Sequence, residues 1–136
     1  LEVNASKVQT EIAGSGNISL SGTYGNLKVK LKGSGNFVGT GMSSQTTEVN
    51  IGGSGNMKLS GTTSSLEIQV IGSGNFNGFE LNSSDTDVKV AGSGQAKVVA
   101  NENLKARING SGTIVYKGNP DKKNTKTNGS GEIKAF

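Results

Sequence analysis

The sequence contains no cysteine, no histidine and no tryptophan, and its single proline is Pro120. Without cysteine the chain can form neither a disulfide nor a thiolate metal site, and cysteine usage does not indicate a compartment. Without histidine it lacks the commonest general base and the commonest transition-metal ligand. Aromatic residues make up only 4% of the chain and hydrophobic residues 31%, and no stretch is long and apolar enough to span a bilayer. These absences predict no cofactor, no membrane span and no histidine-dependent catalysis.

Positive charge is in modest excess, with a net charge of +4, and it is scattered along the chain. The densest basic group is Lys122, Lys123 and Lys126. Nucleic-acid-binding proteins usually combine such a group with aromatic side chains that stack on bases. No aromatic residue adjoins this group in the sequence, so we predict no nucleic-acid partner.

The tripeptide Gly-Ser-Gly recurs along nearly the whole chain. It begins at Gly14, Gly33, Gly53, Gly72, Gly92, Gly110 and Gly129, at intervals of 19, 20, 19, 20, 18 and 19 residues. Such regular recurrence indicates a repeat architecture in one domain, residues 1–136.

Apolar or β-branched residues stand two, four and six positions before most of the motifs, as with Leu31, Val29 and Leu27 before Gly33. Polar residues separate them, and a second, shorter alternation follows each motif. A period of two is typical of strands with one buried face, and no helical period occurs. The sequence therefore predicts an all-β parallel solenoid of about seven rungs of 19–20 residues, with no helix. The competing architecture, an antiparallel sandwich, would not need the same corner in every repeat.

Each Gly-Ser-Gly is expected to form a corner. Continuing the alternation through the motif places both glycines inward and the serine outward, and glycine allows sharp bending and close packing. The predicted corner glycines are Gly14, Gly16, Gly33, Gly35, Gly53, Gly55, Gly72, Gly74, Gly92, Gly94, Gly110, Gly112, Gly129 and Gly131. The segments opposite the corners, such as 22–26 and 61–65, are rich in Gly, Ser, Thr and Asn and predict tight turns.

The two ends of the repeat differ from its middle. Residues 1–13 form an incomplete first coil whose open face would pair with another segment or chain. In the last coil the inward positions become polar at Lys123, Thr125 and Thr127, which predicts a C-terminal cap over residues 119–136. Within the repeat, a Phe37–Gly39 pair alternates with Met57–Leu59, which indicates that neighbouring rungs compensate in volume.

Two polar columns are candidates for function. Asn17, Asn36, Asn56 and Asn75 occupy equivalent positions and are expected to form a hydrogen-bonded ladder, or alternatively a flat face for a glycan or a protein. Glu48, Glu67 and Asp87 would stack roughly 5 Å apart. That column is compatible with a cation site or a carboxylate-based polysaccharide enzyme. We favour a solvated face neutralised by lysines, and therefore assign neither catalytic nor metal-binding residues.

The repeat resembles a bacterial family known as the putative auto-transporter adhesin, head GIN domain. The resemblance lies in the Gly-Ser-Gly, polar, hydrophobic pattern over residues 14–136. It also includes Tyr116-Lys117-Gly118-Asn119-Pro120 and the final Gly129-Ser130-Gly131-Glu132-Ile133-Lys134. It implies a right-handed β-helix-like fold, an adhesive role and a location in the Gram-negative envelope, at the periplasmic or outer surface, or secreted. Many family members carry a further β-rich region ahead of the repeats, most of which this chain lacks, and the family offers no catalytic residues.

Three functional hypotheses follow. The favoured one is a non-catalytic surface or secreted domain whose partner is a glycan or a surface protein. The second is a polysaccharide-acting β-helix enzyme that uses the acidic column. The third is a structural module that self-associates through the open first rung.

Overall fold

The computed structural model describes the backbone of residues 2–136 and the side chains of residues 6–136. The described chain consists of strands joined by short connections, with no helix. The strands are β1 (Glu2–Gly14), β2 (Asn17–Gly33), β3 (Asn36–Gly53), β4 (Asn56–Gly72), β5 (Asn75–Gly92), β6 (Gln95–Val99), β7 (Asn103–Gly110), β8 (Thr113–Lys117), β9 (Lys122–Asn128) and β10 (Glu132–Ala135).

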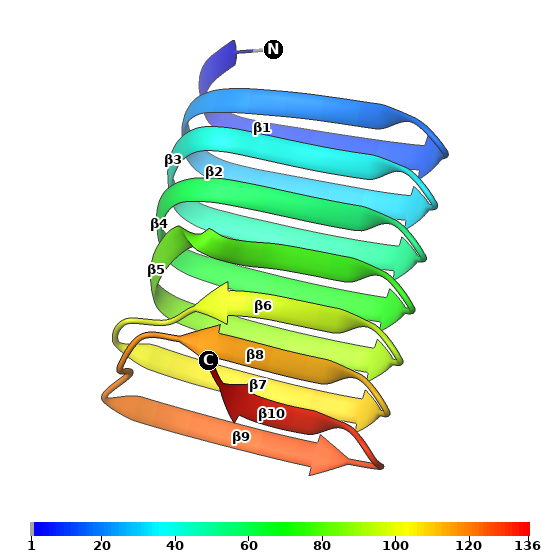
Figure 1. The fold of residues 1–136 in the computed structure, drawn as a ribbon. Coiled ribbons are helices and arrows are strands. Elements are labelled where there is room, and N and C mark those ends of the chain that lie inside the picture. The colour runs from blue at the N-terminus through cyan, green and yellow to red at the C-terminus, as the bar shows by residue number, and fades with distance from the viewer. Residues whose placement is uncertain (1) are drawn as a thin grey trace.

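The chain winds as a flattened coil with two layers (Figure 1). The segments that end at a Gly-Ser-Gly motif, namely the later halves of β1–β5 together with β7 and β9, form what we call the first layer. The segments that follow a motif, namely the early parts of β2–β5 with β6, β8 and β10, form the second layer. Every pairing is parallel, so the predicted β-solenoid of about seven coils is confirmed and the antiparallel sandwich is wrong.

The core lies between the two layers. The predicted inward columns are almost completely buried, with Val29, Val49 and Val70 in the first layer and Leu59 in the second all at 0% exposure. Because a single coil has no second apolar surface of its own, stacking on its neighbours buries these side chains.

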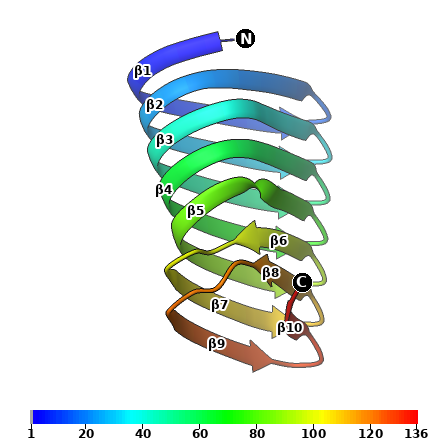
Figure 2. The same ribbon diagram turned by 60° about the vertical axis from the view of Figure 1, so that its left-hand side comes forward.

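The predicted tight turns opposite the corners are wrong for β2–β5. There the backbone stays extended through the whole bend, so each of these strands runs for 17 or 18 residues, and Figure 2 shows the bend as a broad curve. The ladder slips at this curve, for example between Gly39 and Met42. Hydrogen bonds to the neighbouring coil satisfy the backbone here, so no internal turn is required. Only around residues 100–102 and 118–121 does the chain leave the strand conformation at the bend.

The two glycines of each corner play different parts, which corrects the expectation that both point inward. The first glycine has a positive φ, from 92° at Gly14 to 120° at Gly110, and is mostly exposed. The second is buried in the middle coils, as at Gly55 and Gly94. A Cβ on Gly94 would lie 2.6 Å from the carbonyl oxygen of Gly74 in the preceding coil. The first glycine therefore supplies the bend, and the second permits close stacking of the coils.

The predicted volume compensation is confirmed at Gly39. This glycine pairs with Leu59 in the next coil, and a Cβ on it would lie 2.7 Å from Leu59 Cδ2. The sulfur of Met42 occupies the same space. Larger side chains from adjoining positions thus fill the volume that the glycine leaves.

The two ends of the described chain differ. Lys123, Thr125 and Thr127 on β9 are all exposed, whereas Ile12 on β1 is 4% exposed. The boundaries of the incomplete first coil and of the C-terminal cap remain predictions, and Leu1 lies outside the described residues.

Replacing Gly94 with alanine should destabilise the fold by about 1–3 kcal/mol, the usual cost of overpacking. The new methyl group would meet the Gly74 carbonyl and Val70 Cγ1, both closer than 3 Å. Urea unfolding followed by circular dichroism measures the change.

The matched control is Gly16→Ala, at the equivalent position of the first corner. There the nearest atom to a new Cβ is Ile12 Cγ2 at 4.0 Å. This variant should be neutral or more stable by up to about 1 kcal/mol, because alanine restricts the unfolded chain. Equal losses of unfolding free energy in Gly94→Ala and Gly16→Ala would contradict the explanation by close stacking of the coils.

Candidate functional site

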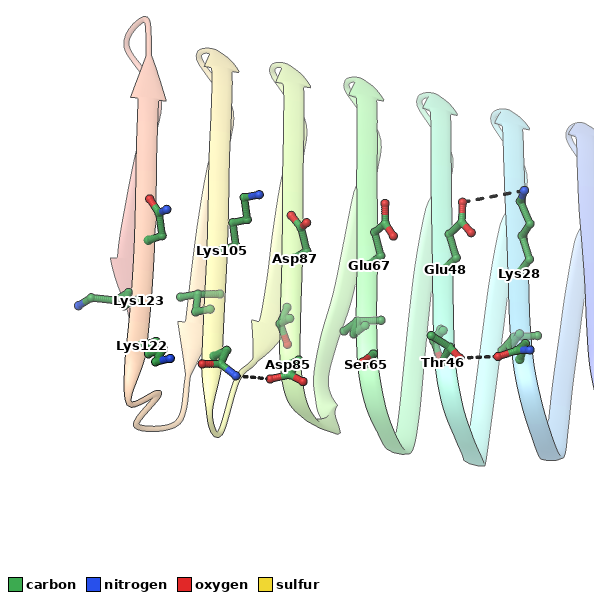
Figure 3. A pocket seen from close by; sticks show the side chains of 18 of the residues that line it. Lys28, Thr46, Glu48, Ser65, Glu67, Asp85, Asp87, Lys105, Lys122 and Lys123 are labelled. Atoms are coloured by element: carbon green, nitrogen blue, oxygen red, sulfur yellow. Dashed lines mark hydrogen bonds and ion pairs between the residues drawn. The ribbon is translucent and has the colours of Figure 1, made fainter.

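A groove follows the outer face of the first layer, beside the curve that leads to the second layer (Figure 3). It encloses about 640 Å³ and crosses every strand of the layer, from β1 to β9. Two outward rows border it. The row seven residues before each motif contains Lys7, Asn26, Thr46, Ser65, Asp85, Asn103 and Lys122. The row five residues before each motif lines the groove with Lys28, Glu48, Glu67, Asp87, Lys105 and Asn124.

The strand backbone forms the floor of the groove between these rows. The intervening side chains point into the core, where Leu27, Leu66 and Leu104 are each 2% exposed. Two intervening threonines are also buried and hydrogen-bonded. Thr86 Oγ1 donates to the carbonyl of Val99 at 2.9 Å, and Thr47 Oγ1 donates to Thr63 Oγ1 at 3.2 Å. The groove is therefore polar at its edges and rests on a fixed, packed base.

Hydrogen bonds between coils order the row nearest the curve. Thr46 Oγ1 donates to Asn26 Oδ1, and Asn103 Nδ2 donates to Asp85 Oδ1 at 2.5 Å. These bonds hold short polar side chains in a line along the rod. The residues of this row line the groove at one per coil.

The acidic column lies in the second row, in the register that the sequence predicts. Glu48 pairs with Glu67 and Glu67 with Asp87, while Lys28 and Lys105 continue the row on either side. Lys28 Nζ lies 3.9 Å from Glu48 Oε1, with both side chains close to half exposed. An exposed ion pair of this kind contributes at most about 1 kcal/mol. The lysines therefore balance the charge of the row without burying it.

The acidic column does not fit a metal site. Its carboxylates follow one another along a line, and no group of three acidic side chains in the described residues converges so as to hold an ion. Calcium takes six to eight oxygen ligands around one point. We therefore assign no metal to Glu48, Glu67 or Asp87.

The four asparagines form a continuous amide ladder at the start of the second layer, directly after the corners. Asn36 Nδ2 donates to Asn17 Oδ1 at 3.1 Å, Asn56 to Asn36 at 3.3 Å, and Asn75 to Asn56 at 2.9 Å. All four side chains are exposed, and they are not among the residues that line the groove. Beyond Asn75 the register continues with Gln95 and Thr113.

Two features of the surface were not predicted from the sequence. The first is a hydrogen bond in the first layer, in which Asn128 Nδ2 donates to Asn109 Oδ1 at 3.1 Å. Both asparagines stand directly before a Gly-Ser-Gly motif, and this shared position is the sequence signal for the pair. Aromatic residues also lie beside lysines. Phe79 and Phe136 meet edge to face with centroids 4.9 Å apart, and Lys117 Nζ lies 5.1 Å from the Phe79 centroid.

No aromatic residue adjoins the basic group Lys122, Lys123 and Lys126 in the sequence, but Tyr116 lies beside Lys123 in space. Lys123 Nζ donates to the hydroxyl of Tyr116 at 2.9 Å and lies 5.4 Å from its ring centroid. The tyrosine is only 9% exposed, so its ring is not available for stacking on a base.

The parallel strand pairings and the regular polar rows on the outer faces define this protein as a β-solenoid repeat domain. The chain belongs to the family described as putative auto-transporter adhesin, head GIN domain, whose model matches residues 1–59 and 24–120.

Solved structures with the same fold cover nearly the whole chain. A putative adhesin from Parabacteroides distasonis is 27% identical with a TM-score of 0.96, over 99% of this chain and 58% of its own. A putative lipid binding protein from the same species is 30% identical with a TM-score of 0.92, over 98% and 56%. A putative adhesin from Bacteroides fragilis is 29% identical with a TM-score of 0.87, over 93% and 60%. The chain thus spans somewhat more than half the length of these relatives.

A search of curated protein sequences found no match. Among the described residues there is no helix of the length and apolar character needed to cross a membrane.

Replacing Asn56 with alanine should remove two links of the amide ladder at once. Each exposed amide hydrogen bond contributes on the order of 0.5–1 kcal/mol, so we expect a loss of about 1–2 kcal/mol in urea unfolding. Asn77→Ala is the control, because Asn77 is an exposed asparagine of the same strand pair whose Oδ1 accepts a local hydrogen bond from the amide of Phe79 at 3.3 Å. An Asn56→Ala loss no larger than that of the control would contradict a stabilising ladder.

Proposed function

We propose that this domain is a non-catalytic adhesive module of the bacterial envelope, carried at the surface or secreted, which binds an extended ligand along the groove of the first layer. The ligand is a glycan chain or an extended segment of a surface protein. The groove itself is the observation that supports this proposal, because it crosses all the coils and presents polar groups at regular intervals.

The dimensions of the groove suit a repeating polymer. Neighbouring strands lie ~4.8 Å apart, so six intervals between β1 and β9 give a groove on the order of 30 Å long. Each coil places a polar side chain on the edge nearest the curve, and in the five middle coils, from Asn26 to Asn103, this side chain is short. From Lys28 to Asn124 the other edge carries a charged or amide side chain in each coil. A polymer of similar subunits would meet the same kind of contact in every coil, which increases affinity by adding weak contacts.

The acidic column is better suited to binding than to catalysis. A glycoside hydrolase needs one carboxyl group as an acid and another as a base or nucleophile, and differing environments keep these roles apart. Glu48 and Glu67 instead occupy equivalent positions in adjacent coils, on the same open face. Family membership with adhesin-like proteins further supports a non-enzymatic role.

Lipid binding, as the name of one relative suggests, receives less support from this chain. An acyl chain requires a continuous apolar surface. Among the described side chains the exposed large hydrophobic residues are Val38, Ile71 and Phe136, which belong to β3, β4 and the C-terminus. They are too few and too far apart in the fold to provide such a surface.

A glycan and matrix-protein array with the wild-type domain tests the proposed function, followed by a groove-filling variant. Ser65→Tyr should weaken the binding of a ligand that occupies the groove about tenfold or more, since the ring would fill the middle of the groove. Val38→Tyr adds the same ring on the second layer, at a position 40% exposed, and should leave affinity unchanged.

Circular dichroism and urea unfolding establish that both tyrosine variants remain folded. If no ligand on the array binds saturably, the adhesive proposal fails. If a ligand binds and both variants retain wild-type affinity, the domain binds elsewhere than in the groove.

We also propose that the edge of β1 can mediate self-association. Within the described chain β1 pairs only with β2, and an open edge can accept another strand. Light scattering across a range of concentrations should then reveal dimers or longer assemblies. Thr10→Lys places a charge on the inward row at this end and should restore the monomer, whereas Gln9→Lys on the outward row should not. A strict monomer at every concentration would end this proposal.

A further inference from the structure

A row of cations crosses the last three strands of the first layer, three residues before each motif. Lys89 on β5 pairs in register with Arg107 on β7, and Arg107 pairs with Lys126 on β9. All three side chains are exposed. They line a small depression of about 140 Å³ together with Asn109, Asn128 and the edge of Ile108. We refer to Lys89, Arg107 and Lys126 as the basic row.

The basic row differs from the acidic column beside it in its charge balance. The acidic column has a lysine at each end and an ion pair between Lys28 and Glu48. Among the described side chains no carboxylate forms an ion pair with Lys89, Arg107 or Lys126; the nearest acid along the strand is Asp87, two residues before Lys89. Like charges directly opposite one another in a sheet are destabilising. A bound polyanion would remove this repulsion.

The spacing and the neighbouring groups indicate the chemistry of that polyanion. The cations repeat at the strand separation of ~4.8 Å, which is close to the length of one sugar residue in a polysaccharide. Arginine binds carboxylate and sulfate groups through paired hydrogen bonds. The linked amides of Asn109 and Asn128 stand in the next row and can exchange hydrogen bonds with sugar hydroxyls.

A nucleic acid fits this surface less well. Single-stranded binding relies on exposed aromatic side chains as stacking platforms. The described residues that line this depression include no aromatic side chain.

We infer that the basic row, with Asn109 and Asn128, is a binding site for an acidic polysaccharide bearing carboxylate or sulfate groups. The chain of the polysaccharide lies along the rod, across β5, β7 and β9. This site is separate from the groove and does not require that the groove bind any ligand.

The test compares the triple variant Lys89→Gln, Arg107→Gln, Lys126→Gln with a control triple of equal charge change, Lys58→Gln, Lys97→Gln, Lys134→Gln. The control residues form one row on the second layer. Calorimetry at physiological ionic strength uses dextran sulfate and polygalacturonate as probes. Neutral dextran serves as the uncharged probe and duplex DNA as the competing polyanion. Thermal unfolding establishes that both triples fold.

Dextran sulfate or polygalacturonate should bind saturably, and neutral dextran should not. The basic-row triple should bind about tenfold more weakly, as expected for three exposed charge contacts, and the control triple about as well as wild type. Ser65→Tyr should leave this binding unchanged, which separates the site from the groove.

Three results would overturn the inference. The first is that neither acidic polysaccharide binds. The second is that the two triple variants lose affinity equally, so that binding follows net charge alone. The third is that duplex DNA binds as tightly through the same three residues, which would make the partner a nucleic acid.

Discussion

The close approach of successive backbones at the Gly-Ser-Gly corner is the constraint on which the rest of this structure depends. At the second corner, the amides of Ser34 and Gly35 both donate to the carbonyl of Gly14 at 3.0 Å, and Asn36 donates to the carbonyl of Gly16 at 3.1 Å. No side chain fits between backbones at this separation. Each corner therefore fixes the height and register of its coil on the preceding one.

Register fixed at the corner determines what lies above and below each side chain in the two layers, up to the curve where the ladder slips. The apolar columns stack into one core, and the outward residues become rows along the rod. A residue type repeated at one position of the sequence repeat then becomes a line of identical groups. The amide ladder, the acidic column and the basic row are three such lines. In each line, stacking places groups of the same chemistry in adjacent coils.

Such a surface suits the recognition of long, repetitive partners more than the chemistry of a single bond. Catalysis needs a few groups with different roles that converge on one point. A solenoid face instead gives many equivalent contacts along a line, each of them weak, whose sum depends on simultaneous engagement. Membership of an adhesin-like family agrees with this physical bias.

The sequence by itself determined the repeat length, the parallel solenoid, the inward columns and the register of Glu48, Glu67 and Asp87. It could do so because stacking in phase converts a position in the repeat directly into a position in space. It could not distinguish the two glycines of a corner, because period-two alternation carries no information about a positive φ at Gly33 or Gly92. It also predicted turns where the backbone stays extended.

Only the tertiary structure decided where the surface is hollowed and which charges are balanced. The groove depends on how the strands curve between the layers, and that curve follows from hydrogen bonds between coils that no single repeat contains. The basic row became distinct because register sets Lys89, Arg107 and Lys126 in line, with no ion-pair partner among the side chains of residues 6–136. In the sequence these residues are 18 or 19 positions apart and look like scattered charge. Composition and spacing define the rows, but curvature and side-chain pairing decide which of them border a hollow and which carry unbalanced charge.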